Sequence, residues 1–113
     1  MNVQIFGTKK SFDSKKAERY FKERGIKYQF VDMKEKGLSK GEFNSVCQAV
    51  GGYEKLIDSK CKDKNLLALI QYLSEEDKKE KILENQKIIR TPIVRNGKQA
   101  TVGYEPDVWK DWK

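Results

Sequence analysis

The sequence of 113 residues contains no histidine, and this absence removes whole classes of chemistry. Histidine is the commonest general base and metal ligand, so its absence excludes every Ser–His or Cys–His mechanism. Cysteine is also scarce, since only Cys47 and Cys61 are present. Two cysteines are too few for a disulfide framework, which favours a reducing cytoplasm as the location. We therefore predict neither a metal site nor a disulfide-stabilised secreted domain.

Long apolar runs are missing as well. The longest run, Leu66 to Ile70, falls far short of the roughly 20 residues that cross a bilayer. Residues 2–6 follow a strand pattern without a signal-peptide core, so we expect no leader and no membrane segment. Hydrophobic residues make up 37% of the chain and charged residues 36%, which is typical of one globular domain with a highly charged surface.

Negative charge is the scarcer sign. Seventeen acidic residues stand against 24 basic ones, which gives a net charge of +7 and a pI of about 9.4. Such an excess can steer a protein toward phosphate, anionic substrates or acidic partners. Acidic residues nevertheless interrupt the basic ones, as in residues 34–36 and 75–81, and this pattern is typical of solvated helix faces. No uninterrupted basic helix or arginine stripe is present, so we expect no direct nucleic-acid binding.

The first third of the chain has the pattern of a β-α-β unit. Apolar residues alternate over residues 2–7, which predicts a first strand. They then recur at helical spacing over about residues 14–24, and we expect this helix to end at Gly25. Residues 27–32 predict a second strand, which a right-handed crossover places parallel to the first.

The middle of the chain is predicted to be helical. Ser39 and Glu42 form a capping-box pattern ahead of an apolar helix face. Ser74 and Asp77 form a further cap before a helix that runs toward Gln86. Residues 39–86 are therefore expected to form a helical insertion between parts of the sheet.

The last third returns to the sheet. Residues 91–94 predict a strand, Asn96-Gly97 is a hairpin turn signal, and residues 99–104 supply the returning strand. Pro106 lies near the first position of a final helix. The expected apolar face of that helix consists of Val108, Trp109 and Trp112.

The order β-α-β, helical insertion, β-hairpin and α predicts an α/β fold with a four-stranded mixed sheet on a thioredoxin-like plan. We expect a single domain over residues 1–113. Its sheet core would comprise about residues 1–32 and 88–113.

The turn at residues 8–16 contains the highest concentration of candidate functional residues. A helix amino terminus presents unpaired N–H groups and a partial positive charge, which favour a bound anion or a thiolate. Four lysines crowd this turn, and Ser11 and Ser14 lie three residues apart. Either serine could cap the helix or donate to an anion. Alternatively, Ser11 or Asp13 only caps the helix while the lysines are solvated, and the residues alone leave both interpretations open.

Three stretches together resemble the arsenate reductase family that includes ArsC, Spx and YffB. In residues 7–17 the pattern is similar to the family's first strand, its cysteine, often a second cysteine three residues later, and a basic-basic-Ala helix start. Residues 74–94 are similar to the late helix and the Arg-Pro strand of the family. Val102-Gly103-Tyr104 is similar to its closing Val-Gly-Phe/Tyr. The resemblance spans nearly the whole chain and implies the thioredoxin-like fold of this family.

The resemblance maps the family's nucleophilic cysteine onto Ser11 and the second cysteine onto Ser14. A thiol here would have its pKa lowered from about 8.5 toward neutrality, whereas a serine hydroxyl stays protonated without a base. Ser11 is therefore expected to be inactive in thiol chemistry. Natural loss of the nucleophile and replacement of a cysteine by serine both fit the sequence. The implied anion-binding residues are Lys9, Lys10, Ser11, Phe12, Asp13 and Ser14.

Further positions depart from the family pattern. Where the family has an arginine immediately before the proline, this chain has Thr91, and Arg90 lies one residue earlier. In a strand Arg90 would point to the opposite face, unless a loop or bulge restores its reach, so it remains a candidate catalytic residue. The resemblance implies a cis Thr91–Pro92 bond that faces residue 11.

The two cysteines have different predicted roles. Cys61 lies among lysines and is a candidate resolving thiol for a cysteine at position 11. Cys47 falls within the apolar face of its helix, which favours a buried structural cysteine.

The resemblance implies a thiol-dependent oxidoreductase scaffold for a small oxyanion or a glutathione-type disulfide. It implies no bound cofactor or metal, and glutathione, glutaredoxin or thioredoxin as electron donor. One alternative is a Spx-like transcriptional regulator that binds RNA polymerase, and another is a pseudoenzyme that binds anions at the turn. In each case we expect a cytoplasmic monomer.

Overall fold

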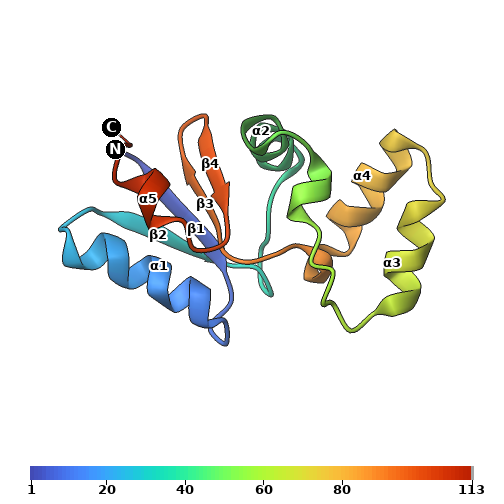
Figure 1. The fold of residues 1–113 in the computed structure, drawn as a ribbon, viewed down its shortest axis with the longest axis horizontal. Helices are drawn as coiled ribbons and strands as arrows, with labels where there is room; N and C mark the ends of the chain where they lie inside the picture. The colour runs from blue at the N-terminus through green and yellow to red at the C-terminus, as the bar shows by residue number, and fades with distance from the viewer. Residues whose placement is uncertain (113) are drawn as a thin grey trace.

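The computed structural model describes residues 1–112 and contains a four-stranded mixed sheet in the order β2-β1-β3-β4 (Figure 1). The parallel pair is formed by β1 and β2, whereas β3 runs antiparallel to both β1 and β4. The predicted α/β class and four-stranded mixed sheet are confirmed. The strands are β1 (Val3–Gly7), β2 (Tyr28–Asp32), β3 (Ile93–Asn96) and β4 (Gln99–Val102).

Helix α1 (Phe12–Glu23) connects the parallel strands β1 and β2. It begins two residues before the predicted start, because Ser11 caps it. It ends in front of Gly25, whose positive φ of 66° suits the left-handed turn that commonly closes a helix. The Ile26 N–H then donates to the Phe21 carbonyl, at 2.9 Å, and the chain enters β2. The observed β-α-β unit thus agrees closely with the one predicted from the sequence.

Two apolar clusters cover the two faces of the sheet, because successive side chains of a strand point in opposite directions. Val3 and Ile5 of β1 pack in one cluster with α1 and α5 (Pro106–Trp109). Phe6 packs in the other cluster, with α2 (Lys40–Val50) and the elements that follow it. Figure 1 shows α1 and α5 together on one side of the strands and α2 on the other.

Helix α2 has the predicted capping box. Ser39 Oγ accepts from the Glu42 N–H at 3.1 Å, and the Ser39 N–H donates to Glu42 Oε1 at 2.8 Å. The helix ends at Gly51, whose φ of 92° is left-handed. Both ends of α2 therefore follow from local sequence signals.

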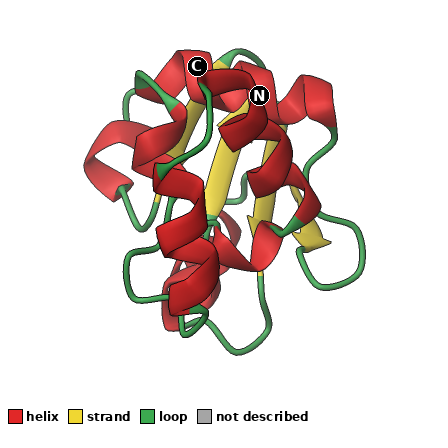
Figure 2. Ribbon diagram, turned by 90° about the vertical axis from the view of Figure 1, so that its right-hand side faces the viewer, coloured by secondary structure: helices red, strands yellow, loops and turns green. Residues whose placement is uncertain are grey.

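The remaining helical elements extend away from the sheet. Figure 1 shows α3 and α4 at the end of the molecule that lies beyond α2, and Figure 2 views the molecule from that end. Tyr53 Oη donates to Glu75 Oε1 at 3.1 Å, and burial, reinforced by this bond, raises the pKa of Tyr53 to about 12. None of the helices in residues 1–112 is long and apolar enough to cross a membrane. The helical elements that follow α2 are η1 (Tyr53–Leu56), α3 (Lys64–Gln71), α4 (Glu75–Glu84) and η2 (Gln86–Ile88).

The β3–β4 hairpin is present, but its turn lies one residue later than predicted. Asn96 pairs with Gln99 across the hairpin, so the two loop residues are Gly97 and Lys98. Asn96 is kept in the strand because its side chain accepts from the Asn2 N–H at 3.1 Å and donates to Gln99 Oε1 at 3.0 Å. Gly97, with φ of 62°, supplies the positive φ at the first loop position.

The returning strands are shorter than predicted. β3 begins at Ile93 rather than Thr91, after the cis Thr91–Pro92 bond. β4 ends at Val102 rather than Tyr104, since Gly103 has φ of 84° and turns the chain away.

The apolar face predicted for α5 is partly wrong. Trp109 and Trp112 are buried, and Trp109 Nε1 donates to Thr101 Oγ1 at 2.7 Å. Val108 instead remains 42% exposed, because the helix is a single turn and only its Trp109 side reaches the sheet.

Candidate functional site

Ser11 lies at the amino end of α1, in the N-cap position. Its Oγ accepts from the Ser14 N–H at 3.2 Å, and its carbonyl accepts from the Lys15 N–H at 3.2 Å. The side chain is half-buried. In the described part of the chain, the next two amides, of Phe12 and Asp13, donate to no protein acceptor. Ser11 thus stands beside two free N–H groups at the positive end of a helix, which is suited to holding an anion.

Ser14 does not share this open position. It is fully buried, and its Oγ accepts from the Thr8 N–H at 3.3 Å. Its side chain packs directly against Gly7, where a Cβ would lie 2.8 Å from Ser14 Cβ. The structure therefore places Ser14 beneath the turn, where it joins α1 to the end of β1 and is hidden from solvent.

The other predicted anion-binding residues surround Ser11 on the surface. Lys9, Lys10 and Asp13 are exposed, and the Phe12 side chain is 81% exposed. Asp13 lies in the first turn of α1, where its negative charge is favoured by the helix dipole and competes with a bound anion. The surface of the turn is therefore basic, with one acidic group and one unusually exposed aromatic ring.

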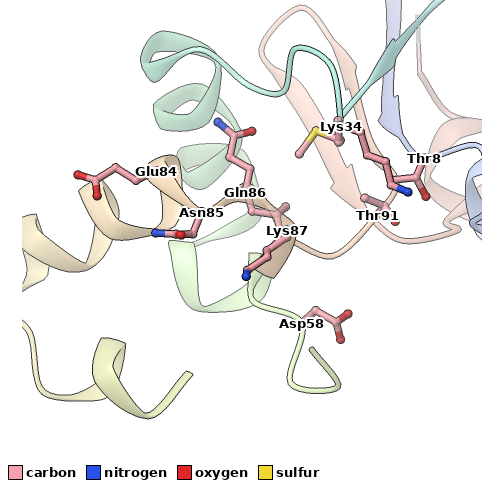
Figure 3. Close-up of a pocket in the computed structure, with 10 residues that line it drawn as sticks. Thr8, Lys34, Asp58, Glu84, Asn85, Gln86, Lys87 and Thr91 are labelled. Atoms are coloured by element: carbon pink, nitrogen blue, oxygen red, sulfur yellow. The ribbon is translucent and has the colours of Figure 1, made fainter. Parts of the chain in front are cut away.

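A cavity of about 550 Å³ opens next to the turn, between the sheet and the helical elements (Figure 3). Thr8 and Lys34, which follow the carboxyl ends of the parallel strands β1 and β2, lie on one side of it with Thr91. Ligands commonly bind at that edge of a parallel sheet. Residues 84–87 and Asp58 line the opposite side. The lining carries both signs of charge.

Two interactions hold the helical side of this cavity in place. The Gln86 amide pairs with the Leu38 backbone in both directions, donating at 2.8 Å and accepting at 2.7 Å. Lys87 Nζ lies 3.0 Å from Asp63 Oδ2. Sequence reasoning missed this lining, because Lys34, Asp58 and Lys87 come from separate segments that no local motif connects.

Arg90, a candidate catalytic residue in the sequence, does not line the cavity beside the turn. Its guanidinium lies beside Gly103, with Nη2 3.3 Å from where a Cβ would stand. It lines a separate groove of about 480 Å³ along β4, together with Lys55 and Val108. Thr91, one residue later, lines the cavity. Arg90 and Thr91 precede β3, and their side chains line different hollows of the surface.

The Thr91–Pro92 bond is cis, in agreement with the expectation from the resemblance. It directly precedes β3, the neighbour of β1 in the sheet. The Pro92 carbonyl accepts from the Gly103 N–H at 2.8 Å, which ties the two family-like segments together.

Neither cysteine lines the cavity. Cys61 is half-buried and packs against the apolar cluster of the helical elements, and its N–H donates to the Asp58 carbonyl at 3.0 Å. Cys47 is buried in α2, as predicted, and burial raises the pKa of its thiol. Among residues 1–112 no group of three acidic, cysteine or histidine side chains is arranged to hold a metal.

The sheet order, the capped α1 after β1 and the cis-proline before β3 together define a thioredoxin-like scaffold. The model of the ArsC family matches residues 6–112. The chain belongs to the ArsC family, and the resemblance seen in the sequence is confirmed.

Curated relatives cover nearly the whole chain. The Global transcriptional regulator Spx 2 of Oceanobacillus iheyensis is 27% identical over 100% of this chain and 94% of the relative. The uncharacterised protein YusI of Bacillus subtilis is 22% identical, over 98% of each chain.

Solved structures share the fold. An arsenate reductase from Vibrio cholerae superposes with a TM-score of 0.82 at 25% identity, over 96% of this chain and 94% of the other. An ArsC family related protein from Bacteroides fragilis superposes with a TM-score of 0.86 at 19% identity, over 100% of this chain and 98% of the other.

Proposed function

We propose that this ArsC-family chain binds a small anion or a glutathione-type disulfide at the Ser11 turn, and that it lacks the nucleophilic thiol needed to reduce either. The observation that carries the proposal is the amino end of α1. There Ser11 Oγ and the free N–H groups of Phe12 and Asp13 lie together, where the family resemblance places a thiolate. A serine at this position keeps the hydrogen bonds but not the redox chemistry.

The cavity beside the turn favours a ligand with charges of both signs. Lys34 and Lys87 contribute positive charge, and Asp58 and Glu84 contribute negative charge. Glutathione carries an ammonium group and carboxylates, so it complements such a lining better than a bare oxyanion does. Arg90 lies in another groove, which leaves the turn without the arginine that would favour arsenate. We therefore rank a glutathione-type disulfide ahead of arsenate.

The proposal assigns the chain to the cytoplasm and to the thiol systems present there. Glutathione, glutaredoxin and thioredoxin are the electron donors that a thiol at position 11 would use. Thr8 and Thr91 are proposed to position the bound disulfide, since both face the cavity. Cys61 is not assigned a resolving role, because the structure holds it against the apolar cluster.

Titration of the isotope-labelled protein, followed by amide NMR shifts, tests this site. Sulfate or arsenate is expected to shift amides of residues 8–15, with weak affinity that decreases as salt rises, because an exposed electrostatic site is screened. Oxidised glutathione is expected to shift those amides together with residues 34, 58 and 84–87.

Arg90→Ala is the matched control, since it removes a nearby cation that lies outside the proposed site. We expect this variant to bind both ligands as the original chain does. Shifts scattered over the surface lysines, or loss of binding in Arg90→Ala, would contradict the proposal.

A second candidate function is transcriptional regulation, favoured by the relative named Global transcriptional regulator Spx 2, which aligns over the whole chain. On this proposal the chain binds RNA polymerase and needs no catalysis. Capture of RNA polymerase subunits on the immobilised protein, unaffected by Ser11→Cys, would support it. If no RNA polymerase subunit is captured at low salt, this second candidate function is contradicted and ligand binding at the Ser11 turn remains.

A further inference from the structure

A second groove, of about 370 Å³, lies between α1 and the start of α5. These two helices lie side by side on one face of the sheet (Figure 1). Neither Ser11 nor any residue of the cavity contributes to this groove. Its lining consists of Lys16, Arg19, Tyr20 and Glu23 from α1, Arg24 directly after α1, and Tyr104 and Pro106 ahead of and within α5.

The groove lies on the part of the chain that holds most of the positive charge. Residues 9–27 contain eight lysines and arginines and three acidic residues, a net charge of +5 out of +7 for the whole sequence. The three ion pairs within residues 1–112 are formed elsewhere, by Lys81, Lys87 and Arg95. None of these pairs involves a cation of residues 9–27, so the excess of five positive charges in that segment is available to an acidic partner.

Two of the cations in the groove are already held in place by aromatic rings. The Arg24 guanidinium lies 3.7 Å from the Tyr20 ring centroid, and its Nη1 donates to the Tyr20 carbonyl at 3.2 Å. Lys16 Nζ lies 5.5 Å from the Tyr104 ring centroid. Cations fixed in this way lose little further freedom on binding, which lowers the entropic cost of an interface.

We propose that this α1–α5 groove docks an acidic segment of a partner polypeptide, whose carboxylates pair with Lys16, Arg19 and Arg24. Tyrosine and arginine are the residues that most often dominate protein interfaces, and both line this groove. The inference is independent of the proposed function, because it involves neither Ser11 nor the cavity.

The same residues argue against a nucleic acid as the occupant. Glu23 lies in the groove, and Glu18 and Asp13 lie on the same helix, so a uniform chain of phosphates would meet repulsion along α1. The Tyr20 and Tyr104 rings each have a cation against them, which leaves less open ring surface for base stacking. A polypeptide can place its carboxylates opposite the cations alone.

The test uses a synthetic peptide of alternating glutamate and alanine, titrated into the isotope-labelled full chain. We expect amide shifts confined to residues 16–24 and 104–106. Arg19→Glu is expected to weaken binding about tenfold, as charge reversal within a polar interface commonly does. Lys78→Glu, a partly exposed site on α4 with the same change in net charge, is the matched control and should change binding less than twofold, about the scale of general screening.

Equal weakening by Arg19→Glu and Lys78→Glu, or no shifts in the groove, would overturn the inference. If a single-stranded DNA oligonucleotide binds in the same groove more tightly than the acidic peptide, the assignment of a polypeptide partner is wrong. Arg19 is exposed and makes no ion pair within residues 1–112, so Arg19→Glu should keep the native amide spectrum.

Discussion

Ser11→Cys is expected to create a thiol with an apparent pKa about one unit below the roughly 8.5 of a free cysteine. The helix dipole and the two free amides of Phe12 and Asp13 stabilise negative charge at this position. At pH 7 such a shift raises the thiolate fraction from about 3% to about 24%. The lower intrinsic nucleophilicity of a more acidic thiol offsets part of this gain, leaving a rate about threefold above that of a free thiol.

Iodoacetamide labelling as a function of pH, with mass spectrometry to separate the sites, measures this effect. Cys47 is the internal reference, and it should label at least tenfold more slowly, because it is buried and burial raises its pKa. Adding Lys9→Gln and Lys10→Gln to Ser11→Cys should move the midpoint upward by a few tenths of a unit. A midpoint at or above about 8.5 would mean that the amino end of α1 does not stabilise an anion.

Gly7→Ala is expected to destabilise the protein by about 1–3 kcal/mol, the usual cost of forcing extra atoms into a packed core. The new Cβ would overlap Ser14 Oγ and lie 2.8 Å from Ser14 Cβ, and Ser14 is fully buried. Relief requires α1 to move away from β1, which breaks the bond from the Thr8 N–H to Ser14 Oγ. The substitution therefore also displaces Ser11 and should weaken anion binding.

Urea unfolding gives the free energy of unfolding for this comparison. Gly41→Ala is the control, since no atom lies within 4 Å of the new Cβ and alanine favours the helix by up to about 1 kcal/mol. In a Ser14→Ala background, Gly7→Ala should cost less, because one of the two overlapping atoms is absent. Equal costs in both backgrounds would show that the contact with Ser14 does not set the position of α1.

Local signals in the sequence predict the elements whose ends are fixed by neighbouring residues. Ser39 and Glu42 satisfy each other within one turn, so the start of α2 is readable without tertiary information. The β-α-β unit and the β-hairpin follow in the same way from periodicity and glycine positions. The hairpin turn was misplaced by one residue because Asn96 bonds to Asn2 and Gln99, and Asn2 is distant in sequence.

The candidate site was predictable only in part. Ser11 and its lysines lie in one short turn, so their grouping is visible in the sequence. The burial of Ser14 depends on the approach of Gly7, and the cavity depends on Lys34, Asp58 and Lys87 coming together from three segments. The separation of Arg90 from Thr91 depends on the path of the chain just before β3. These features depend on tertiary contacts, which residue types and local spacing do not predict.

We propose above all that the turn at Ser11 is an ArsC-family site for a glutathione-type disulfide in which the nucleophilic thiol is missing. The most direct measurement is turnover of a glutathione-type mixed disulfide, and of arsenate, by the original chain and by Ser11→Cys. Each is assayed with glutathione and glutaredoxin, and separately with thioredoxin. We predict background rates for the original chain and clear turnover of the mixed disulfide by Ser11→Cys. Equal turnover by both chains, or a Ser11→Cys protein whose reactive thiol supports no turnover with any donor, would contradict the claim.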